Sequence, residues 1–163
     1  MPSRGSPAFI NKVMQMTRST AREIAVRLVF GQSENPRDPG QYLEEVLEPA
    51  YFETLRDEDA AFSEYPDDAQ LAYIKRVVKG VGEHSAELDS YIERYAVGWK
   101  FGRISRTAVA ILKTSMFEVL YMPDIPNRAA INEAVELSKR YEAPETVPFI
   151  NGLLGSFVRS ETT

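Results

Sequence analysis

The sequence lacks cysteine altogether, which excludes disulfides, zinc–thiolate sites and cysteine nucleophiles. It contains a single histidine, His84, so a histidine-based triad would have one base and no supporting pattern around it. No apolar run approaches the roughly 20 residues that a membrane-spanning helix needs. No glycine-rich phosphate loop follows a strand-like segment. These absences predict a cytoplasmic, non-membrane protein without a catalytic site, metal or cofactor.

Acidic side chains are concentrated in one segment of the chain. Between Asp38 and Asp68 there are eleven acidic residues and one basic residue, Arg56, although the net charge of the whole chain is only -5. The other residues hold 13 acidic and 18 basic side chains, so the remainder is mildly basic. We interpret the acidic segment as solvated loops and short surface helices. The basic remainder is compatible with nucleic-acid binding in spite of the acidic pI.

Apolar residues recur at helical spacing along most of the chain, and no segment has a convincing strand pattern. For 163 residues, this predicts an all-α, single-domain bundle of about six or seven helices covering residues 17–160. Residues 1–16 begin with a stretch that holds one glycine, two serines and two prolines between Pro2 and Pro7. We predict that they form a disordered leader, native or introduced by cloning.

Capping residues and breakers indicate where the helices begin and end. We expect helices over residues 20–32, 42–52, 68–95 (bent near Gly80 and Gly82), 105–121, 131–141 and from 146 onward. Thr20 and Glu23 have the spacing of a capping box, and Ser105 is expected to cap the central helix. Asn132 and Thr146 are expected to cap the last two helices.

Several segments occur together in an ordered set with a resemblance to a known family. They are AREIAVRLVF (21–30), LDSYI (88–92), Trp99, AILKTSMFEVLY (110–121), DIP (124–126), INEAVELSKRY (131–141) and FINGLLG (149–155). In this order the chain resembles the NusB family of bacterial transcription antitermination factors over about residues 17–158. INEAVEL together with FINGLL is the specific pair.

The same fold also resembles the N-terminal RNA-binding module of the ribosomal RNA cytosine methyltransferases. Those proteins continue into a catalytic domain that this sequence does not contain, so the antitermination family is favoured. A stand-alone relative of that module remains an alternative. A second alternative is a helical protein-interaction module that does not bind RNA.

The NusB resemblance implies a factor that catalyses no reaction. It implies a heterodimer with NusE, a small-subunit ribosomal protein that also acts in transcription. The two proteins together would recognise boxA RNA in the nascent transcript. RNA polymerase would then read through terminators, notably in ribosomal RNA operons.

A second apolar patch on the first helix suggests a partner surface. On a helical wheel Val26 and Phe30 lie away from the main apolar face, beside Arg22 and Glu23. Core packing against another helix is the competing interpretation. The resemblance implies that Phe30, together with Phe149, faces NusE. An exposed Val26–Phe30 patch would equally serve a homodimer.

The start of the first helix is the main candidate for RNA contact. The family opens this helix with an arginine-rich arm, of which Arg18 and Arg22 remain here. Arginines there would neutralise phosphates, and Ser19 and Thr20 would offer hydroxyl or backbone donors to a phosphate. Helix capping alone would explain Thr20.

Three further basic residues are weaker RNA candidates. Lys113 stands where the family often has arginine, and a lysine meets a phosphate without bidentate geometry. Arg103 and Arg106 form a small basic cluster near the start of a helix. Ordinary solvated side chains are the competing interpretation for all three.

Overall fold

The structure is a computed structural model that describes the backbone of residues 7–99 and 103–162, and the side chains of these residues from Arg18 onward. Within these ranges all regular structure is helical: α1 (Pro7–Glu34), α2 (Pro39–Val46), α3 (Pro49–Thr54), the short 3₁₀ helix η1 (Ala60–Phe62), α4 (Asp68–Glu83), α5 (Ser85–Tyr95), α6 (Arg106–Tyr121), α7 (Asn127–Tyr141) and α8 (Thr146–Glu161). The predicted all-α fold is confirmed, with eight α-helices in the described residues instead of six or seven. None of the described helices is long and apolar enough to cross a membrane.

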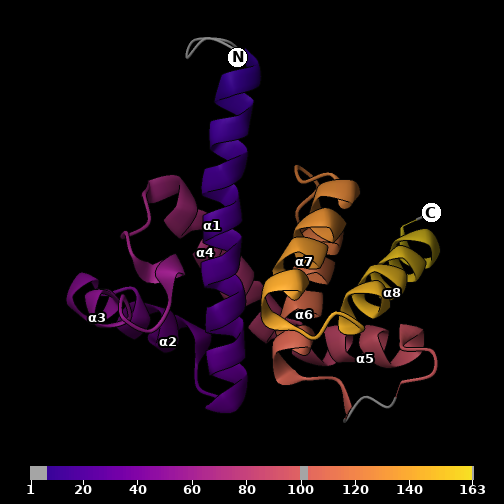
Figure 1. The fold of residues 1–163 in the computed structure, drawn as a ribbon. Helices are drawn as coiled ribbons and strands as arrows, with labels where there is room; N and C mark the ends of the chain where they lie inside the picture. Colours follow the sequence, from indigo (N-terminus) through magenta and orange to yellow (C-terminus); the bar gives the residue numbers. More distant parts are fainter. Residues whose placement is uncertain (1–6, 100–102, 163) are drawn as a thin grey trace.

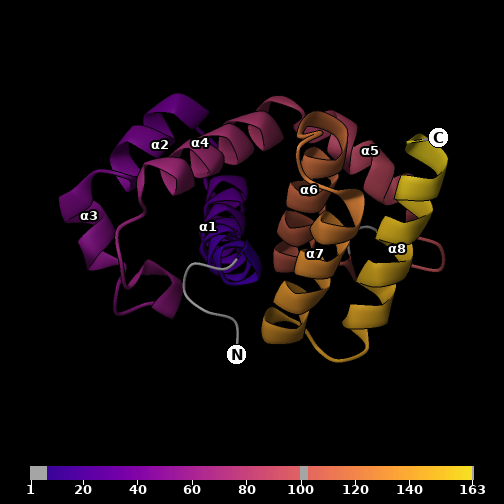
Figure 2. The ribbon, with the colours of Figure 1, turned by 90° about the horizontal axis from the view of Figure 1, so that it is seen from above.

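Helix α1 is the axis around which the other helices are arranged. Figure 1 shows α2 and α3 on one side of it and α5 to α8 on the other. Seen from above, α4 runs past α1 and links the two groups (Figure 2). Helices α4 and α6 and the short helix η1 all contact α1. As a result every residue from 21 to 29 is buried except Arg27.

The first helix is longer than expected. It begins at Pro7, and Thr20, the expected cap, lies inside it. No glycine or proline interrupts residues 8–30, so nothing in this segment ends a helix, and proline is well suited to a first helical position. Part of the predicted leader is therefore helical, while residues 1–6 lie outside the described ranges.

Two of the expected helices are each divided in two. Pro49 starts α3 and separates it from α2, because proline has no N–H to donate to the preceding turn. The expected bent helix over 68–95 is broken at His84, whose backbone angles (φ -107°, ψ 18°) are not helical. This break follows Gly82 by two residues, close to the predicted bend.

Helix α4 approaches α6 closely at Gly80. A Cβ atom at this position would lie 2.1 Å from the Phe117 ring, so any larger residue would displace that ring. The absence of a side chain allows the two helices to pack tightly, and Tyr73, seven residues earlier on α4, reaches Glu118 on α6.

The caps of the last three helices match the predictions only in part. Ser105 caps α6 as expected, its Oγ accepting a hydrogen bond from the Ala108 amide at 3.0 Å. Helix α7 begins at Asn127, directly after Pro126, so the prediction that Asn132 caps it was wrong. Thr146 is the first residue of α8 rather than its cap.

Candidate nucleic-acid and protein interface

The predicted RNA arm lies on the part of α1 that faces α4 and α7. Arg18 is exposed, with its guanidinium carbon 5.3 Å from the centre of the Tyr73 ring on α4. Ser19 is half-buried and donates its hydroxyl to Glu133 Oε1 on α7 at 3.0 Å. Thr20 is exposed. Arg18 is thus the accessible cation of this arm.

Arg22 does not reach the surface, and its prediction as an RNA contact is corrected. Its side chain is only 5% exposed, and its Nε and Nη2 donate to the two carboxylate oxygens of Glu118, each at 2.7 Å. Glu133 lies 3.6 Å away on the other side. Glu118 is fully buried and also accepts the Tyr73 hydroxyl at 2.7 Å. This bidentate ion pair joins α1 to α6, so the role of Arg22 is to stabilise the fold.

The buried position of this cluster changes the pKa values of two of its members. Burial alone would lower the pKa of Arg22, but the hydrogen bond to Glu118 and the surrounding negative charge outweigh it and raise that pKa above its ordinary value. Burial, reinforced by the Glu118 carboxylate, raises the pKa of Tyr73 well above 10.0. Arg22 therefore stays charged and Tyr73 neutral throughout the physiological pH range.

The predicted apolar patch on α1 is not an exposed surface. Val26 is 1% exposed, so its prediction as a partner-binding or homodimer residue is corrected. Phe30 is half-buried and packs against the core. The reason is the enclosure of α1: α4, α6 and η1 all contact it, and every residue from 21 to 29 except Arg27 is buried. A helical wheel cannot reveal how many neighbours a helix has.

Phe149, the other predicted partner residue, belongs to an apolar surface group. It is half-buried in the first turn of α8, and its ring lies against that of Trp99, with 4.6 Å between centroids. Trp99 is 40% exposed and the nearby Val97 is 86% exposed. Exposed large apolar side chains are few among the residues whose side chains the structure describes, which makes this group a candidate protein contact.

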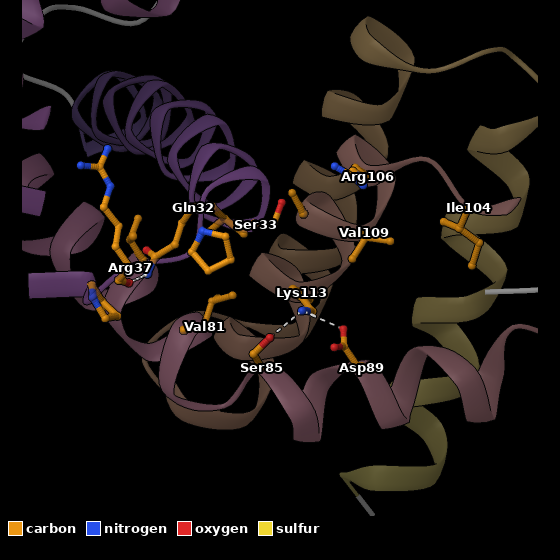
Figure 3. A pocket seen from close by; sticks show the side chains of 16 residues that line it. Gln32, Ser33, Arg37, Val81, Ser85, Asp89, Ile104, Arg106, Val109 and Lys113 are labelled. Atoms are coloured by element: carbon orange, nitrogen blue, oxygen red, sulfur yellow. Dashed lines mark hydrogen bonds and ion pairs between the residues drawn. The ribbon is translucent and has the colours of Figure 1, made fainter. Parts of the chain in front are cut away.

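Arg106 and Lys113 line a cavity of about 750 Å³. The cavity lies where the end of α1, the α1–α2 connection, the α4–α5 junction and the first half of α6 meet (Figure 3). Its lining residues are Val29, Gln32, Ser33, Pro36, Arg37, Pro39, Val78, Val81, Gly82, Ser85, Asp89, Ile104, Arg106, Val109, Ala110 and Lys113. Most of the wall is apolar, and its charges come from α6, α5 and the α1–α2 connection.

The cations of this cavity already have partners. Lys113 is only 9% exposed, and its Nζ lies 2.8 Å from Ser85 Oγ and 2.7 Å from Asp89 Oδ1 (Figure 3). Arg106 is exposed and forms an ion pair with Glu34 at the end of α1. Lys113 is thus held in place, rather than being a freely solvated lysine.

Arg103, the remaining basic candidate, is exposed close to the start of α6. The predicted RNA residues consequently fall into two groups. Arg18 lies beside Tyr73 on α4, whereas Lys113 lies beside Ser85 on α5, beyond the break at His84. The structure does not bring these groups into one compact site.

Three side chains of the cavity escaped the sequence analysis. Ser85 and Asp89 hold Lys113, and Gln32 donates its amide to the Arg37 carbonyl at 2.8 Å. Ser85 and Asp89 lie four residues apart on α5, whereas Gln32 lies near the end of α1. Only the tertiary structure shows that they share a wall with Arg106 and Lys113.

Comparison with known proteins gives a consistent result. The NusB family profile matches residues 19–159. The chain is 35% identical to the transcription antitermination protein NusB of Clostridium botulinum (strain Kyoto / Type A2), across 88% of this chain and 100% of that protein. It is 39% identical to the transcription antitermination protein NusB of Acetivibrio thermocellus, across 88% of this chain and 90% of that protein.

Solved structures share the fold. NusB of T. maritima aligns with a TM-score of 0.72 at 26% identity, over 90% of this chain and 93% of that one. A chain in a crystal structure of a plectonemic RNA supercoil aligns with a TM-score of 0.71 over 90% of this chain and 97% of that one, and at 20% identity it shows the fold alone. From the family profile and the curated relatives, the chain belongs to the NusB family.

Proposed function

We propose that this chain is a transcription antitermination factor that forms a heterodimer with NusE and binds boxA-type nascent RNA together with it. The complex would support read-through by RNA polymerase, notably in ribosomal RNA operons. The observation that carries this proposal is the similarity to proteins named as transcription antitermination protein NusB across 90–100% of their length.

The RNA contacts are assigned to the basic residues that remain accessible. Arg18 on α1, with Ser19 and Thr20 beside it, is the first group. Arg103 and Arg106 with the partly accessible Lys113 form the second. Because Arg22 is enclosed, Arg18 is left as the accessible arginine of the α1 arm, which predicts weak RNA binding by this chain alone.

The NusE contact is assigned to Phe149 and Phe30. The exposed Trp99 ring supports Phe149, because paired aromatic rings offer a large, rigid apolar area to a partner. Phe30 contributes only the part of its ring that is not packed against the core.

The test is to measure the affinity of a boxA-like RNA for this chain at two salt concentrations, with and without NusE. We expect tighter binding with NusE present, and a steeper salt dependence because more phosphates are contacted. If NusE does not increase the affinity, the antitermination proposal fails. A helical protein-interaction module would then be the better assignment.

A second measurement isolates the partner surface. Phe149→Ala should weaken NusE binding without changing RNA binding by the chain alone. Val158→Ala, a half-buried apolar change elsewhere on α8, is the matched control. Equal NusE affinity for both variants would remove Phe149 from the interface.

A further inference from the structure

The exposed face of α4 carries a group of cations without ion-pair partners. Lys75, Arg76 and Lys79 are all exposed. Among the described residues, none of the three has a carboxylate oxygen within 4.0 Å. We call these three residues the α4 basic strip.

Most other cations in the described part of the chain are neutralised locally. Ion pairs are formed by Arg22, Arg27, Arg37, Arg94, Arg106, Lys113, Lys139 and Arg140. The α4 basic strip therefore presents a positive charge that the fold itself does not compensate. Such a charge attracts an external anion more strongly than paired cations do.

The spacing of the strip places its side chains together. Positions 75, 76 and 79 share one face of the helix, and Lys75 and Lys79 are about 6 Å apart along its axis. Arg76 donates Nη2 to the Tyr121 carbonyl at 2.7 Å, which holds this arginine against the end of α6. One of the five guanidinium donors is used there, and the others remain for a ligand.

Arg18 extends the strip across to α1. Its guanidinium lies over the ring of Tyr73, one helical turn before Arg76 on α4, and Arg18 has no carboxylate partner among the described residues either. Acidic residues occur on this face only toward the helix ends, at Asp68 and Glu83. Arg18 therefore lies on the neighbouring helix α1, beside a residue of α4 that is one turn from Arg76.

The chemistry of this face fits the phosphate backbone of a nucleic-acid strand better than the surface of a partner protein. Its other exposed residues are small, Ala69, Ala72 and Gly82, so it offers no apolar anchor of the kind that the centre of a protein interface requires. Flexible lysines in a row adapt to successive phosphates of one strand. We propose that the α4 basic strip binds the phosphate backbone of RNA and continues the path that starts at Arg18.

This proposal rests on the proposed RNA-binding function and adds residues outside the predicted arm. Because phosphates carry no base identity, the strip would contribute affinity without sequence preference. Sequence preference would come from separate contacts to the RNA bases.

The test uses the full chain with NusE and a fluorescent single-stranded RNA, either boxA-like or scrambled. In Lys75→Ala/Lys79→Ala we expect the affinity for both RNAs to fall by the same factor, about tenfold or more near 0.1 M salt, and the slope of log affinity against log salt to decrease by about 1.4. Lys75→Arg/Lys79→Arg should retain binding. Arg56→Ala, which removes an exposed cation from the acidic segment, is the matched control and should bind like the parent chain.

Thermal unfolding of each variant excludes a structural cause, because the substituted side chains are exposed and should leave the midpoint unchanged. If Arg18→Ala weakens RNA binding while Lys75→Ala/Lys79→Ala leaves both affinity and salt slope unaltered, the strip is not on the RNA path and only this inference is overturned. If no RNA binds with NusE present, the proposed function and this inference fail together.

Discussion

Lys113 and Glu118 lie five positions apart on helix α6, and their charged groups have very different surroundings. Glu118 is fully buried, with Arg22 and Tyr73 occupying its two oxygens. Lys113 lies at the wall of a cavity, where Ser85 and Asp89 use two of its three donors. Asp89 itself is 40% exposed.

This difference distinguishes a structural ion pair from one that can serve a ligand. A buried charge must be fully compensated within the protein, because no water reaches it. A charge beside a cavity can exchange its partners for water or an anion at little cost. We therefore regard the Arg22–Glu118 pair as part of the fold, and the Lys113–Asp89 pair as one that water reaches through Asp89.

The largest expected effect comes from Arg22→Met, which leaves Glu118 buried without its main partner. Loss of one member of a buried pair should lower the free energy of unfolding by about 3–5 kcal/mol, measured by urea denaturation. Adding Glu118→Met should recover much of that loss, since no unpaired charge remains. A loss below about 1 kcal/mol for Arg22→Met would contradict the structural role of the pair.

Tyr73→Phe should have an intermediate effect. It removes one of the donors to Glu118 and should cost about 1–2 kcal/mol in the free energy of unfolding. Tyr65→Phe, which removes an exposed tyrosine hydroxyl that donates to the Leu47 carbonyl, serves as a control and should cost less. Equal losses of unfolding free energy in both variants would show that the buried hydrogen bond from Tyr73 to Glu118 stabilises the fold no more than the exposed one from Tyr65.

The same tyrosine predicts a pH dependence. The fold raises the pKa of Tyr73 above its ordinary value of 10.0, so the neutral hydroxyl is favoured in the folded state. Its contribution to stability is fully present below about pH 10 and is lost as the pH rises above that value, because the unfolded chain ionises first. Urea denaturation at pH 8 to 11 should show a steeper decline for the parent chain than for Tyr73→Phe. If the unfolding free energies of the two proteins fell in parallel with pH, ionisation of Tyr73 would not be the cause of the decline.

Lys113→Met should be the mildest change for stability. Its partner Asp89 is reached by water, so the cost should be about 1 kcal/mol or less, and raising the salt concentration should reduce it further. The Arg22→Met loss should hardly depend on salt. If salt reduced the stability losses of Lys113→Met and Arg22→Met equally, the distinction between the buried Arg22–Glu118 pair and the water-accessible Lys113–Asp89 pair would be wrong.

Several features could be predicted from local pattern. The all-α class and the Ser105 cap depend on nearest neighbours along the chain, and both are present. Other predictions failed where the outcome depends on distant partners. Arg22 and Val26 have the pattern of surface residues, yet α4, α6 and η1 enclose them.

The sequence by itself determined the helical fold and the family, because apolar periodicity and the INEAVEL and FINGLL segments are properties of the chain alone. Only the tertiary structure decided which cations remain accessible. Arg22 and Arg18 are one helical turn apart, but the first meets the Glu118 carboxylate ninety-six residues away, whereas the second is exposed and lies over the face of Tyr73. Whether a charge is neutralised depends on what the fold brings within a few ångströms of it, and no local pattern contains that information.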